Sequence, residues 1–203
     1  AEAWVPEFLV PYYPPGTWRA FDPRAGGMSL GATNYIGLAG LGLDAARYNP
    51  NDPSVAKKLG MMGYDWSSTP EQVTDGLSNT IYLIQTAPGM PRPWIAGGGS
   101  TLVGIDENSK SPLDGFAHQA PGGQTGTAIL MADGSVRFLQ GNVSPEIFKA
   151  LVTRAGGETL TDLDTVAPKS GPQGKNAELR GNPVPPTPKP PTEPTVPKPE
   201  AGK

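Results

Sequence analysis

The side chains in this sequence with the most chemical potential are its one histidine, His118, and two aspartates that each precede glycine, Asp75 and Asp133. A histidine with two carboxylates could act as an acid–base set or bind a metal ion. Zinc sites, however, usually take three or four ligands of matched type, and the sequence has no second histidine and no cysteine. Turn geometry alone also favours aspartate before glycine. We therefore interpret these three residues as structural, and we predict no catalytic residue and no cofactor.

A second group of oxygen ligands lies in the polar segment 106–115, which includes Asp106, Glu107 and Asp114. Carboxylate and carbonyl oxygens are the ligands that calcium prefers. Ser111 stands where an EF-hand loop requires glycine, and no glutamate closes the loop. The sequence therefore leaves a calcium site open as an alternative and does not predict one.

Composition excludes several classes of function. The 16 basic and 19 acidic residues give a net charge of −3 without a basic stripe, which argues against nucleic acid as a partner. The absence of cysteine excludes disulfides and thiolate chemistry. No apolar run approaches the roughly 20 residues that span a bilayer. The chain begins at Ala1 without a basic and apolar leader, so we expect a processed or trimmed product.

The strongest local signal is a β-hairpin over residues 126–141. Two β-prone runs flank Asp133-Gly134, a pair typical of type I′ turns, which need positive φ at both central residues. Ala132 and Ser135 would then close the turn. The first run, 128–131, is apolar throughout, which indicates a central strand covered on both faces.

A helix is predicted over 145–155, after the hairpin. Ser144 is a favoured N-cap, Pro145 suits the first helical position, and Gly156 suits the position after the helix. Its apolar stripe should pack on a sheet. Further strands are predicted over 33–38, 78–86 and 100–105, and short helices over 54–59 and after Thr69. The predicted fold class is α+β, with a mainly antiparallel sheet and the C-terminal helix on one face.

The chain divides into three predicted regions. Residues 1–27 form an extended segment rich in proline and aromatic rings that cover the domain, with a carbohydrate-binding platform as the alternative. Residues 28–161 form the globular head. Residues 162–203 form a Pro-rich low-complexity tail with nine prolines in its last 22 residues. We expect a disordered, semi-rigid spacer outside the folded core, so that truncation after Glu158 leaves the head stable; a Pro-rich ligand for a partner domain is the alternative.

Four groups of residues occur in an order that resembles a known family. They are 33–37 (Thr-Asn-Tyr-Ile-Gly), 74–81 (Thr-Asp-Gly-Leu-Ser-Asn-Thr-Ile), His118 with Pro121-Gly122-Gly123 and 132–138, and 151–158. Together they resemble the bacterial prepilin-type, pseudopilin-like proteins of unknown function that are named for a motif of His, nine residues, then Asp-Gly. The resemblance covers roughly residues 30–158.

The chain departs from that family pattern in three places. It lacks the prepilin cleavage site and long apolar N-terminal helix with which family members usually start. Fourteen residues separate His118 from Asp133, and Gln85 stands where the strand commonly ends near a glutamate. The matching motif residues, which we expect to be structural, are His118, Gly122, Gly123, Asp133, Gly134, Asp75, Gly76 and Asn79.

The resemblance implies an exported protein of the periplasm, cell envelope or cell surface that is not an enzyme. It would be a structural or assembly subunit in a surface filament, a secretion-related assembly or the envelope. Its partners would be further copies of itself or other envelope and secretion proteins, and it would meet a membrane only through the N-terminal helix that this chain lacks. The alternative is a periplasmic or surface module that binds a small ligand or glycan through aromatic loops. An exposed lateral hydrophobic patch would favour the first, and a closed aromatic pocket the second.

Overall fold

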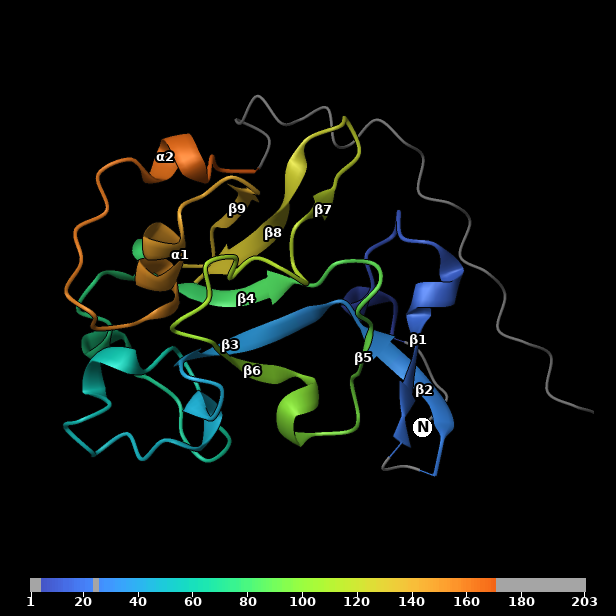
Figure 1. The fold of residues 1–203 in the computed structure, drawn as a ribbon, viewed down its shortest axis with the longest axis horizontal. Helices are drawn as coiled ribbons and strands as arrows, with labels where there is room; N and C mark the ends of the chain where they lie inside the picture. The colour runs from blue at the N-terminus through green and yellow to red at the C-terminus, as the bar shows by residue number, and fades with distance from the viewer. Residues whose placement is uncertain (1–4, 24–25, 171–203) are drawn as a thin grey trace, which may run out of the picture.

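The computed structural model describes residues 5–23 and 26–170, which form two sheets, short helices and long irregular connections (Figure 1). The predicted α+β class is confirmed. The small sheet has the order β1-β2-β5, with bounds Arg19–Asp22, Met28–Thr33 and Arg92–Pro93. The strands of the large sheet are β3 (Tyr35–Leu41), β4 (Ile81–Gln85), β6 (Leu102–Ile105), β7 (His118–Gln119), β8 (Thr125–Met131) and β9 (Val136–Gln140). The α-helices are α1 (Pro145–Val152) and α2 (Leu163–Val166), and 3-10 turns are η1 (Pro6–Phe8), η2 (Pro15–Trp18), η4 (Ala45–Arg47), η5 (Ala56–Lys58), η6 (Pro70–Gln72), η7 (Leu77–Asn79) and η8 (Gly98–Ser100).

Strand β8 lies inside the large sheet and is paired on both edges. β9 pairs with it from Gly126 to Leu130, so β9 occupies one whole edge. β4 pairs with residues 129–131 of β8, and β7 pairs with residues 125–126. β9 occupies one edge of β8 along these residues. β4 and β7 therefore both pair with the opposite edge of β8, one after the other along its length. Beyond β4 the sheet continues with β3 antiparallel and then β6 parallel.

The predicted hairpin is confirmed, and its turn differs from the prediction. Gly134 N–H donates to the Met131 carbonyl at 3.0 Å, and Met131 N–H donates to the Ser135 carbonyl at 2.8 Å. Gly134 has φ +83°, whereas no other residue type in the described chain has positive φ. The loop is therefore a type I turn followed by a left-handed glycine, closed by Met131 and Ser135. This turn needs only one left-handed residue, so Asp133 avoids the strain that type I′ would impose on it.

Helix α1 packs on the large sheet as predicted. The Ser144 hydroxyl accepts the Ile147 N–H at 3.3 Å, and Phe148 and Leu151 are fully buried in the main core. The helix ends at Val152 rather than residue 155, because Thr153 is already extended with ψ 146°. Gly156 therefore does not follow the helix directly.

Other elements differ from their predicted bounds in length more than in type. The strand predicted over 33–38 is two strands that meet at Asn34, and the one predicted over 78–86 begins at Ile81 after the turn η7. The helices predicted at 54–59 and after Thr69 are the 3-10 turns η5 and η6. In η6, Gln72 Oε1 accepts the Thr69 N–H at 3.0 Å, as in a capping box.

The described part of the N-terminal segment is not simply extended. It contains η1, η2 and β1, and it packs onto the domain through Leu9, Val10 and Tyr13, which are buried. Phe8 and Phe21 remain exposed. Its rings therefore cover the sheet only in part.

The prediction that the chain leaves the folded core at residue 162 is wrong for residues 162–170. Leu163 and Ala167 lie in the main core, with Ala167 fully buried. The buried Arg137 guanidinium donates to Asp164 at 2.7 Å and to the Ala167 carbonyl at 2.8 Å. Phe138 N–H donates to the Pro168 carbonyl, so this segment also covers the outer edge of β9. The rest of the predicted tail, 171–203, lies outside the described residues.

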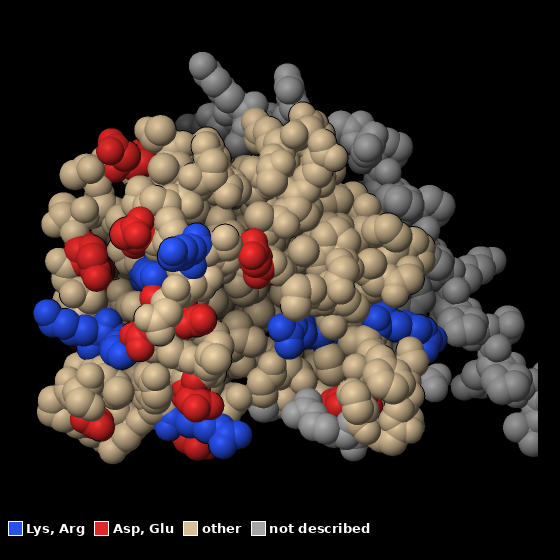
Figure 2. Space-filling view, viewed as in Figure 1, with Lys and Arg blue, Asp and Glu red and all other residues tan. Residues whose placement is uncertain are grey.

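Figure 2 shows basic and acidic side chains interspersed on one face. Within the described ranges, no helix combines the length and apolar character needed to cross a membrane.

These contacts correct the expected result of truncation. Ending the chain after Ser170 should leave the free energy of unfolding unchanged within about 0.5 kcal/mol. Ending it after Glu158 should lower stability by about 2–5 kcal/mol, because the core loses the side chains of Leu163 and Ala167. Denaturant unfolding of both proteins measures the difference. Equal stability would show that the 163–170 segment contributes nothing to the core.

Candidate functional site

The meeting point of β4 and β7 gathers four polar side chains, Tyr12, Tyr13, Gln85 and His118, here called the Tyr–His cluster. Gln85 is the last residue of β4 and His118 the first of β7, so their shared position along β8 brings them together. The Thr127 hydroxyl of β8 fixes the junction by donating to the Gln85 carbonyl at 2.8 Å. The two tyrosines arrive from the N-terminal segment, just before η2.

The hydrogen bonds of the cluster form one connected network. The Gln85 side-chain amide lies 3.1 Å from the Tyr12 hydroxyl and 2.8 Å from that of Tyr13, and it donates to both. Tyr13 donates its own proton to the Thr86 carbonyl at 2.8 Å. Its hydroxyl oxygen also lies 3.2 Å from Nδ1 and 3.1 Å from Nε2 of His118.

The network assigns a tautomer to His118. Nδ1 lies 3.1 Å from the Phe116 carbonyl, which can only accept, so Nδ1 carries the proton. Nε2 is then an acceptor and lies 3.4 Å from the Tyr12 hydroxyl. With this assignment, both Gln85 amide protons, both tyrosine protons and the histidine proton have acceptors.

The chemistry available to this cluster is limited. Burial raises the pKa of Tyr13 and of Tyr12, and donation from Gln85 offsets this only in part. Both hydroxyls therefore stay protonated near neutral pH and act as hydrogen-bonding groups rather than nucleophiles. The cluster connects the N-terminal segment to two strands.

Asp75 makes the other long-range polar connection. Its carboxylate accepts the N–H of Gly156 at 2.7 Å and that of Gly157 at 3.0 Å. Asp75 N–H donates to the Arg154 carbonyl at 3.2 Å. These bonds hold the chain after α1 in an irregular path, which explains why Gly156 does not close the helix.

Asp133 serves its own turn. Its carboxylate accepts the Ser135 N–H at 2.8 Å and the Ser135 hydroxyl at 2.6 Å. Donation from that hydroxyl lowers the pKa of the Asp133 carboxyl. His118 pairs with Gly126 at one end of β8 and Asp133 follows the other end, a span of about 20 Å at roughly 3.3 Å per residue. The structure therefore does not bring His118 and Asp133 into one site.

The remaining motif residues lie in turns. The Asn79 amide donates to the Asp75 carbonyl at 2.9 Å. Gly76, Gly122 and Gly123 all have positive φ, as does Gly134, a conformation that side chains disfavour.

No metal site is formed by the described part of the chain, in which no three His, Cys, Asp or Glu side chains gather to hold an ion. Asp106, Glu107 and Asp114, whose carboxylates left a calcium site open in the sequence, do not gather around one point. Asp106 accepts the Asn108 N–H at 2.9 Å, and Glu107 pairs with Lys58 at 2.8 Å.

Several connecting residues were missed by the sequence analysis. Asn34 is fully buried, and its side chain accepts the Val10 N–H at 3.0 Å. The Arg154 guanidinium donates to the Ser68 hydroxyl at 2.6 Å and lies 5.5 Å from the centre of the Trp66 ring. Both residues lie inside motif regions of the resemblance, Asn34 in 33–37 and Arg154 in 151–158, and this was the available signal.

A comparison of the chain with protein families, curated proteins and solved structures finds no match.

Removing the two aspartates should have unequal effects on stability. Asp75→Ala leaves two backbone donors without their charged acceptor and should cost about 2 kcal/mol or more. Asp133→Ala removes only local turn bonds and should cost about 1 kcal/mol or less. Asp75→Asn, which keeps an acceptor oxygen, should fall between the two. Thermal unfolding gives the order, and a larger loss for Asp133→Ala would contradict these roles.

The buried Tyr13 hydroxyl should make stability fall at alkaline pH. Its pKa is raised in the folded state, so its contribution is complete below the unfolded value of about 10 and is lost as pH rises above it. Tyr13→Phe should therefore flatten the decline of unfolding free energy above about pH 10. Tyr82→Phe, on an exposed ring of β4, is the matched control. An unchanged slope in Tyr13→Phe would show that this hydroxyl ionises equally in both states.

Proposed function

We propose that this chain is the head of an exported, pseudopilin-like assembly subunit that acts by association and not by catalysis. Its setting would be a surface filament, a secretion-related assembly or the cell envelope. The proposal combines the order of motifs in the sequence with one surface feature, an exposed apolar area on the small sheet.

The small-sheet apolar surface consists of Phe21 and Met90. Their exposed fractions are 68% and 43%, which is high for large apolar side chains. Phe21 on β1 and Met90 before β5 line one cleft of about 500 Å³. Met28, although 56% exposed, pairs with Asp22 and therefore lies on the opposite face of the small sheet from Phe21, whose partner is Ser29. Clustered apolar exposure of this kind marks association surfaces more often than single exposed residues do.

The internal use of the motif residues supports a non-catalytic role. Asp75 connects two of the four motif regions by bonding to Gly156 and Gly157. Gln85 and His118, which occupy the family's glutamate and histidine positions, meet in a network whose protons are all accepted within the fold. The requirements of folding alone are therefore enough to explain why these residues match the family motifs.

Partners follow from the same surface. We infer self-association or contact with other envelope and secretion proteins. The interspersed charges in Figure 2 and the net charge of −3 favour protein partners over nucleic acid.

A glycan- or ligand-binding module is the second candidate. The exposed ring of Tyr12 and the pair Phe8 and Trp94, whose ring centres are 6.1 Å apart, favour it. It ranks second because these rings lie on the surface and do not enclose a pocket among the described clefts.

The association role predicts that polar substitutions on the small sheet weaken self-association. The double variant Phe21→Ser, Met90→Ser should raise the dissociation constant at least about tenfold, since each ring or thioether contributes about 1–2 kcal/mol when buried. Sedimentation velocity over a concentration series measures it. Val136→Ser, 43% exposed on β9, is the control and should change nothing. A wild-type chain that stays monomeric at every concentration, or a double variant that associates normally, would contradict the proposal.

A further inference from the structure

Strand β6 forms one edge of the large sheet, with β3 on its inner side only. Residues alternate in the direction of their backbone groups along a parallel pair. Gly37 N–H donates to the Thr101 carbonyl and Gly42 N–H donates to the Ile105 carbonyl, so the odd-numbered residues of this stretch face β3. Leu102 and Gly104 therefore direct their N–H and C=O groups outward, and no other strand among the described residues pairs with them.

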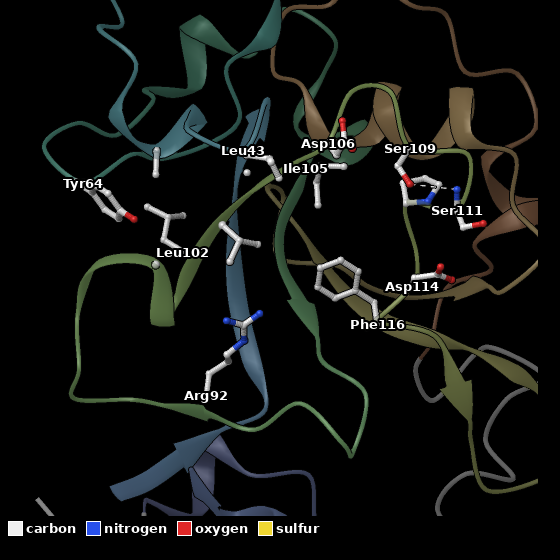
Figure 3. A pocket seen from close by; sticks show the side chains of 15 residues that line it. Leu43, Tyr64, Arg92, Leu102, Ile105, Asp106, Ser109, Ser111, Asp114 and Phe116 are labelled. Carbon is white, nitrogen blue, oxygen red and sulfur yellow. Dashed lines mark hydrogen bonds between the residues drawn. The ribbon is translucent and has the colours of Figure 1, made fainter. Parts of the chain in front are cut away.

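That outer edge lies at the base of a groove of about 470 Å³, called here the β6 groove (Figure 3). All four residues of β6 line it. One wall carries Leu43 and Tyr64, and the other carries Ser109, Ser111 and Asp114 from the loop before β7. The groove thus exposes strand backbone between an apolar wall and a polar wall.

Charge is distributed unequally along the β6 groove. Figure 3 shows Arg92 beyond Leu102, at the end where β6 begins, and Asp106 just past Ile105, where it ends. Asp114 adds a second carboxylate on the polar wall. No hydrogen bond or ion pair within the described chain engages the Arg92 or Asp114 side chain. The groove therefore has a basic end and an acidic end that are open to a ligand.

The walls decide what can pair with this edge. If two copies met through their β6 edges, the groove walls of one copy would collide with those of the other, because the loops on either side of β6 flank the edge. A single extended chain, roughly 10 Å across with its side chains, has no such obstruction. Exposed backbone donors and acceptors in line are what an added strand requires.

We propose that the β6 groove binds an extended peptide from another protein, which adds to the sheet as an antiparallel strand. Antiparallel pairing places the N-terminal end of the peptide near Asp106 and Asp114, and its C-terminal end near Arg92. Successive side chains alternate between the two walls, so apolar residues face Leu43 and Tyr64 and hydroxyl residues face the serines. The recognised peptide thus begins with a basic residue, continues with alternating hydroxyl and apolar residues, and ends with an acidic residue.

A synthetic peptide tests this directly. The full chain is titrated into fluorescein-labelled Lys-Thr-Val-Thr-Val-Glu, and anisotropy reports binding. The control peptide exchanges the end charges, giving Glu-Thr-Val-Thr-Val-Lys, and should bind at least tenfold more weakly. A third peptide with N-methylated valines loses the strand hydrogen bonds and should not bind. On binding of the first peptide, amide hydrogen exchange at Leu102 and Gly104 should slow.

Protein variants supply the second arm of the test. Arg92→Glu should remove the preference between the two charged peptides, and Asp114→Lys should weaken the first peptide, whereas Arg19→Glu on β1 should leave both affinities unchanged. Equal affinity for the two charged peptides, binding that survives N-methylation, or no binding at about 1 mM would overturn the proposal. So would dimerisation that protects Leu102 and Gly104 without peptide, which would assign the groove to a second copy. Repeating the titration with Phe21→Ser separates this result from self-association on the small sheet.

Discussion

Pairing of β8 on both edges is the constraint from which the rest of the large sheet follows. β9 takes one edge, and β4 and β7 divide the other, so the end of one strand must meet the start of the next. This junction places Gln85 beside His118, although 32 residues lie between them. The tyrosine hydroxyls of the N-terminal segment then find donors and acceptors already in place. The Tyr–His cluster is therefore a consequence of strand order, and it fastens a segment that contributes no strand to this sheet.

Outside the sheets, a few polar side chains determine the path of the irregular chain. Buried backbone N–H and C=O groups need partners whether or not they belong to a helix or strand. Asn34 provides three such bonds: its side chain accepts from Val10, its N–H donates to Phe8, and its carbonyl accepts from Thr86. Asp75 does the same for the chain after α1. One side-chain amide or carboxylate thus takes the place of several backbone–backbone hydrogen bonds. Folding requirements alone can therefore account for distinctive polar residues at fixed positions in the sequence.

The sequence was informative where the signal is local. The hairpin around Gly134 and the start of α1 at Ser144 follow from turn and cap chemistry within a few residues, and both were predicted. The end of α1 was misplaced because Asp75, distant in sequence, captures the glycines after it. The packing of 162–170 was missed for a similar reason: the buried Arg137 guanidinium needs an acceptor, and only the fold shows that Asp164 supplies one. The Tyr–His cluster depends on strand order, which no local pattern contains.

The outer strands β6 and β9 of the large sheet differ in how their free edges are covered, and this difference bears on how the molecule meets partners. An exposed strand edge invites pairing with any other edge and thus aggregation, so proteins usually cover or interrupt it. The outer edge of β9 is covered by residues 168–170 of the same chain. The edge of β6 is left unpaired, but its flanking loops stand above it on both sides. A recessed edge resists the flat edges of other sheets and still admits one extended chain. Selectivity then arises first from shape, because the walls exclude sheets, and only afterwards from the charges at the two ends of the groove.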